Sequence, residues 1–331
     1  MRDIVRTVRR WREEQVAGAV VRPVAESGLG ARRADAALAI SAKGERAGDL
    51  YGGAADAAVS ATAREVIDDG RARLLDVELS EDAAVSAGLA CGGRARLLFQ
   101  PVVDLPPAWW EAIERPQGAA LVTPLGDAPG PSTAVTPDGA VHPGPDGGEV
   151  PGEVLDVARR RLAKNRGTRE IVTAAGADYL VETAAAPPHL LVVGGGELGA
   201  ALVRQARLLR WEGESVPTAA EAVARYAANT CLVVLSHDPA IDTPALTAAL
   251  EAGIPYVGAL GARHTQESRA ERLRAEGVSD EKIASIRGPV GLDLGARSPE
   301  ETALAVCAEI LSVLSGRAPV PLRDTTGAIN A

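Results

Sequence analysis

The sequence predicts an α/β protein in which a small α+β domain precedes a domain with a doubly wound parallel sheet. Its 331 residues suggest two domains. Strand-like and helix-like segments alternate after residue 189, which is typical of a doubly wound sheet. The proline pair in Ala184-Ala-Ala-Pro-Pro188 stops regular structure. We therefore expect an N-terminal domain over 1–186 with a Pro/Gly-rich β region at about 106–186, a C-terminal domain over 187–317 and a flexible tail over 318–331.

The elements expected in the first domain follow from apolar spacing and turn residues. Ile4, Val8 and Trp11 lie at helical spacing, which predicts a helix over 3–15. Asp138-Gly139 is a strong hairpin signal, and Gly70 suits the end of a helix. We expect further helices over 54–69 and 154–164, a hairpin loop over 26–30, and strands over 17–23, 36–41, 72–78, 95–103, 119–124, 132–135, 171–174 and 178–182. No internal repeat is visible in the sequence.

The second domain has the clearer alternation. Its last helix is the best defined, because Ser298 can cap it, Pro299 suits its first turn, Glu301 completes a capping box and Gly316 lies beyond its end. The other expected elements are strands over 190–193, 231–235 and 255–260 and helices over 197–210, 219–226, 243–252 and 265–276. A second strand before residue 219 is barely visible.

Charge and composition exclude several classes of protein. The formal net charge of −9 argues against binding to nucleic acid or to anionic membranes, which need basic surfaces. No apolar run approaches the roughly 20 residues that span a bilayer, and the N-terminus does not read as a signal peptide. We therefore expect a cytoplasmic protein. Cys91, Cys231 and Cys307 form no CxxC pattern, so neither a disulfide framework nor a structural zinc site is indicated.

A glycine pattern opens the second domain. Gly194, Gly196 and Gly199 follow a strand and precede a helix, which is the context of the dinucleotide-binding fingerprint of Rossmann-like domains. The backbone amides there would bind phosphate, and Glu212 or Glu214 has the sequence distance of a ribose ligand. The alternative is a glycine turn that binds no dinucleotide.

Two further loops follow strands and so should reach the ligand-binding edge of the sheet. In Ser236-His237-Asp238, His237 could act as a proton shuttle oriented by Asp238 or Asp242. The alternative is that Ser236 and Asp238 only cap a turn and a helix. Gly258, Gly261 and Arg263 belong to a second phosphate-binding type of turn, although Arg263 could instead pair with Asp238 or Asp293.

Cys91 is the cysteine whose setting suggests chemistry. It stands between Gly88 and Gly92-Gly93, so little side-chain bulk shields a thiolate that could ligate a soft metal or carry sulfur. The alternative is a small buried apolar residue, which we expect of Cys231 and Cys307. Gly52-Gly53 can offer backbone amides but has no thiol beside it.

These motifs together resemble the XdhC/CoxI family, accessory proteins in the maturation of molybdenum hydroxylases such as xanthine and carbon monoxide dehydrogenases. The likeness covers most of the chain. It rests on Gly-Gly at 52–53, Cys-Gly-Gly at 91–93, Val-Val-Gly-Gly-Gly at 192–196, Leu-Ser-His-Asp-Pro at 235–239, Tyr-Val-Gly-Ala-Leu-Gly at 256–261 and Pro-Val-Gly-Leu-Asp-Leu-Gly-Ala-Arg-Ser-Pro-Glu-Glu at 289–301. The last string is long and specific.

The resemblance implies a molybdenum cofactor chaperone rather than an enzyme. Such a protein binds molybdopterin or its dinucleotide form, protects it during sulfuration and hands it to a molybdenum hydroxylase apoenzyme, with a cysteine desulfurase as a further partner. A homodimer is a further expectation. The expected cofactor-binding residues are Gly52, Gly53, Cys91, Gly92, Gly93, Gly194, Gly196, Gly199, Ser236, His237, Gly258, Gly261 and Arg263. Cys91 would approach the molybdenum, and Cys91, His237 and Asp238 are the catalytic candidates.

Two departures from the family pattern bear on these roles. The family's first glycine element usually reads Ser-Gly-Gly-Cys, whereas this chain has Tyr51-Gly52-Gly53-Ala54, so a thiol role there is lost or transferred to Cys91. The family also usually has a longer second strand, most of which this chain omits between Trp211 and Ala219. Two alternatives therefore stay open. One is an oxidoreductase that uses NAD(P) at Gly194–Gly199 with His237 as acid/base, and the other is a degenerate, non-catalytic accessory subunit.

Overall fold

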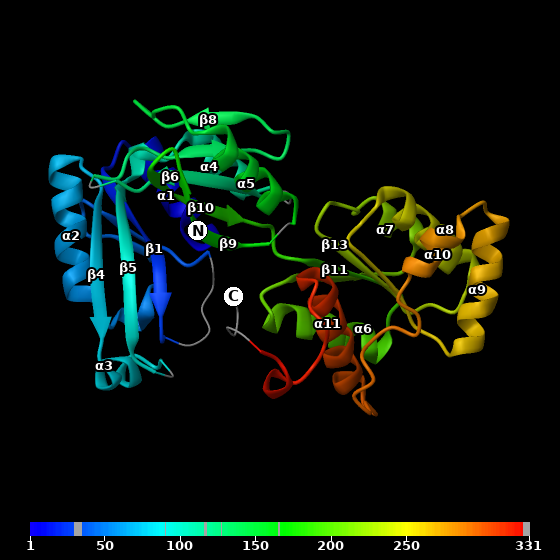
Figure 1. Ribbon diagram of the computed structural model, residues 1–331. Helices are drawn as coiled ribbons and strands as arrows, with labels where there is room; N and C mark the ends of the chain where they lie inside the picture. Colours follow the sequence, from blue (N-terminus) through cyan, green and yellow to red (C-terminus); the bar gives the residue numbers. More distant parts are fainter. Residues whose placement is uncertain (30–34, 90, 116–117, 127, 165, 327–331) are drawn as a thin grey trace. The chain divides into compact units, whose positions relative to one another are not determined.

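The computed structural model describes residues 1–29, 35–89, 91–115, 118–126, 128–164 and 166–326, and it confirms the mixed α/β class (Figure 1). The chain divides into two compact units, Met1–Ala186 and Pro187–Ala331. The loop expected over 26–30 lies partly outside the described residues. No described helix is long and apolar enough to cross a membrane.

The first unit contains two five-stranded antiparallel sheets. The first has the order β3-β2-β1-β5-β4 and the second the order β8-β7-β6-β10-β9. Their strands are β1 (Gly18–Ser27), β2 (Leu38–Ser41), β3 (Arg46–Gly48), β4 (Arg73–Leu79), β5 (Gly93–Pro101), β6 (Ala119–Pro124), β7 (Thr133–Val135), β8 (Val141–Pro143), β9 (Thr168–Ala174) and β10 (Ala177–Ala184).

Helices cover both sheets of the first unit. They are α1 (Val5–Glu13), α2 (Asp56–Asp69), α3 (Glu81–Ser86), α4 (Pro107–Ile113) and α5 (Gly152–Ala163). The inner faces of both sheets share one core with α1 and α4, in which Trp11, Trp109 and Trp110 are buried. The outer faces pack against α2 on the first sheet and α5 on the second. Alternation of apolar side chains along β1 and β6 supplies both faces.

The two halves of the first unit repeat one topology. Each half runs helix, three strands, helix and two strands, and in each half the last strand returns to pair with the first. The registers coincide as well. Ala19, Val20 and Val21 pair with Ile40, Ala39 and Leu38, whereas Ala120, Leu121 and Val122 pair with Val135, Ala134 and Thr133. The expectation of no internal repeat was wrong, because the duplication is preserved in hydrogen-bond register much more clearly than in residue identity.

The registers define which residues of the two repeats are equivalent. Leu38–Gly48 corresponds to 133–143, and Arg22 corresponds to Thr123. Val21 pairs with Phe99 and Val122 pairs with Val181, so Gln100 corresponds to Glu182. The repeats differ most between their last two strands, since residues 80–92 join β4 to β5 but only residues 175–176 join β9 to β10. The longer connection carries α3 and Cys91.

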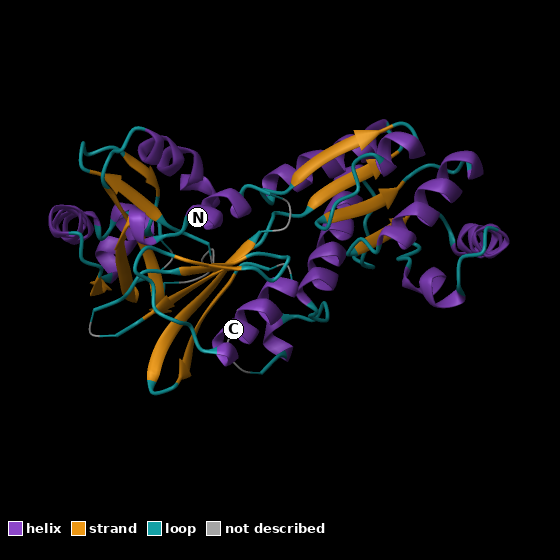
Figure 2. Ribbon diagram, turned by 90° about the horizontal axis from the view of Figure 1, so that it is seen from above, coloured by secondary structure: helices purple, strands orange, loops and turns teal. Residues whose placement is uncertain are grey.

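The second unit is a three-layer domain, in which helices lie on both sides of the sheet (Figure 2). The sheet is parallel and has the order β12-β11-β13-β14. Helices α6 and α11 cover one face, and α7, α8 and α9 cover the other. Its elements are β11 (His189–Val193), α6 (Gly196–Leu208), β12 (Glu212–Val216), α7 (Ala219–Val223), β13 (Thr230–Val234), α8 (Pro239–Ala252), β14 (Tyr256–Ala259), α9 (Arg263–Ala275), α10 (Asp280–Ser285) and α11 (Pro299–Ser315).

Local signals placed the boundaries of the last helix correctly. The Ser298 side chain accepts the Glu301 amide, the Glu301 carboxylate accepts the Ser298 amide, and Gly316 ends α11 in the left-handed conformation. The second strand is complete as β12 and pairs with β11 along its whole length, so the view that most of it is missing was wrong. The strand is difficult to recognise from its sequence, Glu-Gly-Glu-Ser-Val, because this segment is polar and an edge strand needs little apolar surface.

Asp104 gives a testable pH dependence in the first unit. Desolvation raises the pKa of its half-buried carboxyl group to about 6, above the value of about 3.9 in an unfolded chain. Because the folded-state pKa is the higher one, Asp104 is neutral and does not destabilise the fold below about pH 4. As the pH rises through 6, ionisation of this desolvated carboxyl group lowers the free energy of unfolding. We expect Asp104→Asn to raise the free energy of unfolding by about 1 kcal/mol at pH 7, after allowance for solvent screening, and by much less at pH 4. Urea unfolding at both pH values checks this, and an equal gain at both would contradict it.

Candidate functional site

The carboxyl edge of the second unit's sheet begins with the glycine turn after β11. Gly194 and Gly196 have positive φ angles of 105° and 79°, which favour glycine. A Cβ atom on Gly194 would lie 3.1 Å from the Ser236 amide, so the turn after β11 lies directly beside the turn after β13. Among the described residues, no atom lies within 4 Å of a Cβ built on Gly195 or Gly196, apart from chain neighbours. The turn is therefore open to a ligand.

The N-terminus of α6 has the features of an anion site. Its N-cap is Gly195, so no side chain occupies the first amide groups of the helix. The Ser215 hydroxyl donates to the Gly194 carbonyl at 2.6 Å and fixes the turn from β12. Gly199 is buried, but a Cβ there would make only ordinary contacts, the nearest at 3.4 Å. The open amides and the positive end of the helix dipole suit a phosphate group.

The expected ribose ligands lie elsewhere. Glu212 begins β12 at the amino end of the sheet, opposite the glycine turn. Glu214 accepts from His189 Nε2 at 3.0 Å and from Arg225 Nε at 3.0 Å. Beyond β12, the chain continues through Val216, Pro217 and Thr218, none of which is acidic. The interpretation of Glu212 and Glu214 as ribose ligands was wrong, since sequence distance does not specify the end of the strand.

The Ser236-His237-Asp238 turn follows β13 as expected. The Ser236 hydroxyl accepts the Asp238 amide at 3.0 Å, and Asp238 caps α8 by accepting the Ala240 amide at 2.9 Å. The capping interpretation is therefore confirmed for these two side chains. His237 is exposed, and Asp238 Oδ1 is already engaged by the helix, so this structure contains no His–Asp pair at the turn. His237 can contact a ligand at the edge, but no described neighbour orients it for proton transfer.

The turn after β14 presents a second helix N-terminus. Arg263 begins α9, whose N-cap Ala262 provides no side-chain cap. Arg263 is exposed and forms no ion pair with Asp238, Asp293 or any other described residue. Gly261 has a φ of 131° and shapes the turn. This turn thus combines a free guanidinium with open helix amides, a combination that favours anions.

Two neighbours of this turn have structural roles. Gly258 lies inside β14, where a Cβ would come within 2.7 Å of Val290 Cγ2 and 2.9 Å of Tyr256, so close packing explains the glycine. Arg269, six residues after Arg263 in α9, is buried and pairs with Asp242 at 2.7 Å. Neither residue faces the edge with Arg263. The buried pair instead ties α9 to α8.

The loop that follows α10 completes the edge, and its anchor was not predicted. Gly258 forms an isolated parallel bridge with Arg287, so the chain adds a short pairing beside β14. Glu309 of α11 accepts both the Gly291 amide at 2.9 Å and the Tyr256 hydroxyl at 2.6 Å. Burial and this contact with Glu309 raise the pKa of Tyr256 well above its ordinary value. Glu309 therefore holds the 288–297 loop, which contains most of the longest family-like string.

In the first unit, the Gly52–Gly53 turn lies against the connection that carries Cys91. A Cβ on Gly52 would lie 2.4 Å from the carbonyl of Ala87, which ends α3 in the middle of that connection. Close packing explains the other glycines: a Cβ on Gly92 would lie 2.5 Å from the Leu79 carbonyl, and one on Gly93 2.3 Å from the Ser27 carbonyl. Cys91 is partly exposed and unbonded to sulfur, whereas Cys231 and Cys307 are buried in the core, where burial raises the pKa of each thiol to about 12.

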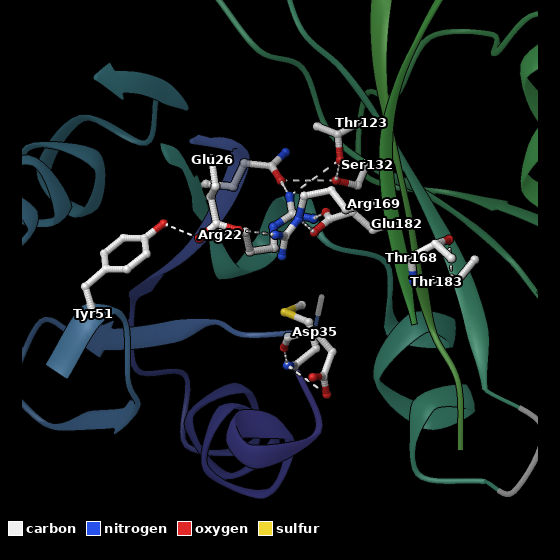
Figure 3. A network of polar contacts seen from close by, with 12 residues as sticks. Arg22, Glu26, Asp35, Tyr51, Thr123, Ser132, Thr168, Arg169, Glu182 and Thr183 are labelled. Atoms are coloured by element: carbon white, nitrogen blue, oxygen red, sulfur yellow. Dashed lines mark hydrogen bonds and ion pairs between the residues drawn. The ribbon is translucent and has the colours of Figure 1, made fainter. Parts of the chain in front are cut away.

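Tyr51 connects the Gly52–Gly53 turn to a buried polar network (Figure 3). Its side chain is buried, its φ is 57°, and its hydroxyl donates to Glu26 Oε1 at 2.8 Å. Arg169 of β9 bridges Glu26 and Glu182, with 3.4 Å to each carboxylate. Glu182 in turn pairs with Arg22. Residues of the second repeat thus support the glycine turn of the first.

The centre of this network lies where the repeats meet. Arg22 is fully buried and contacts Glu182, Gln100 and Thr123. Thr123 is the equivalent of Arg22, and Glu182 is the equivalent of Gln100, so Arg22 contacts its own equivalent and both members of the second equivalent pair. The Ser132 hydroxyl joins them through Thr123 at 2.8 Å and Gln100 at 3.1 Å. Among the described residues, no group of three or more His, Cys, Asp or Glu side chains is placed to hold a metal ion.

Comparisons with known proteins agree with the sequence motifs. Residues 190–310 match the XdhC Rossmann domain, and residues 11–78 match the XdhC and CoxI family. The uncharacterized protein YqeB of Escherichia coli K12 is 27% identical over 191 residues, which is 49% of this chain and 35% of YqeB. The molybdenum cofactor insertion chaperone PaoD of the same organism is 40% identical over 94 residues, which is 28% of this chain and 30% of PaoD. Each match thus spans about a third of these relatives.

A crystal structure of a protein named xanthine dehydrogenase, from Bacillus halodurans, has the same fold. It superposes with a TM-score of 0.64 at 17% identity and covers 95% of this chain and 96% of that one. The fold and the carboxyl edge of the parallel sheet define a protein in which a duplicated α+β unit is followed along the chain by a Rossmann-type unit. The chain belongs to the XdhC and CoxI family.

Proposed function

We propose that this protein is a chaperone that binds the molybdenum cofactor and supports its insertion into a molybdenum enzyme. The observation that carries the proposal is the 40% identity with PaoD, whose name describes that activity. The family match to both units supports it. We propose further that the recipient is a hydroxylase of the xanthine or carbon monoxide dehydrogenase type, that sulfuration involves a cysteine desulfurase, and that the handover is cytoplasmic.

The residues present fit such a cargo in chemical terms. Molybdopterin carries a phosphate group, and the open N-termini of α6 and α9 with Arg263 supply amides and a cation for it. The cofactor's metal–sulfur chemistry needs a soft or polarisable neighbour, and Cys91 is partly exposed in a glycine-lined connection. On this proposal Arg263 of the second unit is the candidate for binding the phosphate, and Cys91 of the first unit is a separate candidate for contact with the molybdenum or its sulfur.

The oxidoreductase alternative has weaker support. A nicotinamide dinucleotide would need a group at the carboxyl end of β12 to hold its ribose, and Glu212 and Glu214 do not lie there. Hydride transfer would need an oriented acid or base, but Asp238 is engaged in capping α8 rather than in orienting His237. We therefore do not propose it.

Cofactor retention tests the proposal. The protein would be purified from a host that makes molybdopterin and assayed for molybdenum and for the fluorescence of oxidised pterin. We expect near-stoichiometric pterin, reduced at least tenfold in Arg263→Ala because the phosphate loses its cation. In Cys91→Ser we expect the molybdenum to decrease more than the pterin, because the thiol would contact the metal end.

A matched control lies close to Cys91. Val85 of α3 is 63% exposed, so Val85→Ser alters the same connection without removing the thiol and should retain the cofactor. Pterin loss in Val85→Ser equal to that in Cys91→Ser would show that Cys91 has no special role. Absence of pterin from the wild-type protein, with a nicotinamide dinucleotide bound instead, would overturn the chaperone proposal.

A further inference from the structure

A basic groove lies on the outside of the first repeat, away from the residues discussed so far. It has a volume of about 460 Å³ and runs between the β2–β3 turn and α2. Its polar lining includes Ser41, Lys43, Gly44, Arg46, Ser60 and Arg64. We call this set the basic groove. Its volume falls within the range of roughly 300–1,000 Å³ that is typical of small-molecule sites.

Two of the three cations in the basic groove form no ion pair with a described residue. Neither Lys43 nor Arg64 forms an ion pair or a side-chain hydrogen bond with any described residue. Arg46 is held in place by Asp56 at 2.6 Å and by the Ser60 hydroxyl at 3.3 Å. One carboxylate, Asp68, also lines the groove. The cations therefore remain in excess even when Asp68 and Asp56 are both counted against them.

The nearest other carboxylate does not neutralise the groove. Glu45 follows the turn, but its two oxygens accept from Arg10 and from Trp11 Nε1. These bonds, with a smaller Coulombic contribution from Lys43, lower the pKa of Glu45, so the carboxylate stays charged while its hydrogen bonds are made to α1. The side chains of Lys43 and Arg64 have no hydrogen-bond partner among the described residues. Free cations around a concave surface attract an anion more strongly than the same cations on a flat one.

The duplication provides an internal comparison for the basic groove. The turns have the same hydrogen bonds: Ser41 N to Glu45 O and Gly44 N to Ser41 O in the first repeat, and Thr136 N to Ala140 O and Gly139 N to Thr136 O in the second. Two of the three cations of the first repeat have no basic equivalent in the second repeat, although the backbone of the turn is the same. Asp138 stands at the position of Lys43 and Val141 at that of Arg46.

The third cation of the basic groove, Arg64, has an arginine as its equivalent in the second repeat, but that arginine is ion-paired. Val59 and Ala63 of α2 are buried on the first sheet as Val154 and Ala158 of α5 are on the second, so Arg159 corresponds to Arg64. Arg159 pairs with Asp156 at 3.1 Å, whereas Arg64 has no such partner among the described residues. The same scaffold thus folds without a cluster of free cations, and the charge of the basic groove is not a requirement of the fold.

We propose that the basic groove binds a phosphorylated small molecule. Arginine and lysine side chains with nearby serine hydroxyls can form charge-assisted hydrogen bonds to phosphate oxygens. A net charge of −9 for the whole chain disfavours a nucleic acid or an anionic membrane as the ligand. This site does not depend on the chaperone proposal, since its residues are separate from Cys91 and Arg263.

Titration calorimetry of the full chain with inorganic pyrophosphate tests the site. We expect saturable binding that is at least tenfold weaker in Arg64→Ala and in Lys43→Asp, and weaker again in the double variant. Lys43→Asp follows the second repeat, whose equivalent turn forms with Asp138. Affinity should fall as salt is raised. A nucleoside monophosphate should bind at least as well as orthophosphate, because the groove has room for more than the phosphate group.

Two controls make the outcome decisive. Arg159→Ala removes the equivalent arginine of the second repeat and should leave the affinity unchanged. Arg263→Ala removes the anion-binding candidate of the second unit, and the binding that depends on Arg64 should persist in it. No binding to the wild-type chain, unchanged affinity in the double variant, or complete loss in Arg263→Ala would each overturn the proposal. If Lys43→Asp fails to fold, Lys43→Gln with Arg64→Gln replaces it, and folding is checked by circular dichroism.

Discussion

Glu182→Ala is expected to destabilise the first unit by about 3–5 kcal/mol, because it leaves the guanidinium of Arg22 buried without its anion. Arg22 has no exposed surface, and the substitution also removes one of the two carboxylates that Arg169 bridges. Burial already lowers the pKa of Arg22, and Glu182 is the main group that opposes this effect. The midpoint and free energy of urea unfolding, followed by tryptophan fluorescence, measure the loss.

A double substitution separates the loss of a charge partner from the loss of packing. Arg22→Met with Glu182→Leu removes both charges and keeps apolar volume, so it should recover a large part of the stability lost in Glu182→Ala. Arg159→Ala breaks an ion pair between exposed side chains and should cost less than about 1 kcal/mol. If Glu182→Ala cost no more than Arg159→Ala, the buried pair would not be a major contributor to stability.

Gly52→Ala is expected to have the second large effect. Its φ of 57° costs an alanine about 1–2 kcal/mol, and the new Cβ would lie 2.4 Å from the backbone carbonyl of Ala87. A backbone atom cannot rotate away, so the overlap adds about 1–3 kcal/mol and separates the turn from the connection that carries Cys91. We expect a loss of about 2–5 kcal/mol in unfolding free energy together with loss of cofactor retention.

Gly88→Ala is the matched control for this effect. Gly88 has a similar φ of 75°. Apart from chain neighbours, no atom of the described residues lies within 4 Å of the position that an alanine Cβ would take, so only the conformational cost should remain. The difference between the two variants then measures the close approach itself. Equal losses in Gly52→Ala and Gly88→Ala would show that the turn and the Cys91 connection are not in essential contact.

Elements with strong local signals could be predicted from the sequence. The capping box of α11 and the apolar run of β6 required no knowledge of distant residues, and both were placed correctly. The same holds for the Gly194 turn and for Asp138-Gly139, because each has a glycine with a positive φ angle, which glycine adopts without strain. In the candidate site, the placement of the turns at one carboxyl edge follows from strand–helix alternation alone.

Features that depend on distant partners could not be predicted. The short helix α4 begins at Pro107 in a Pro-rich stretch and is held by burial of Trp109 and Trp110 against α1 and the inner strand faces, which no local pattern shows. Arg22 lies within an apolar run, and its partners come from β5, β6 and β10. The duplication escaped detection because register conserves hydrogen bonds and burial while most side chains change.

The Arg22–Glu182 pair has a consequence for the history of the molecule. If a single repeat had once assembled with a second copy of itself, equivalent positions would have carried identical residues on both sides of the symmetry axis. Arg22 would then have faced a second arginine where Thr123 now stands, and glutamine or glutamate would have filled both of the other positions. Unlike partners at equivalent positions require two copies with different sequences, as the two repeats of this polypeptide supply. The asymmetric centre of the first unit therefore depends on the divergence of the repeats, as does the presence of Cys91 and the basic groove in one repeat while the other keeps the same fold.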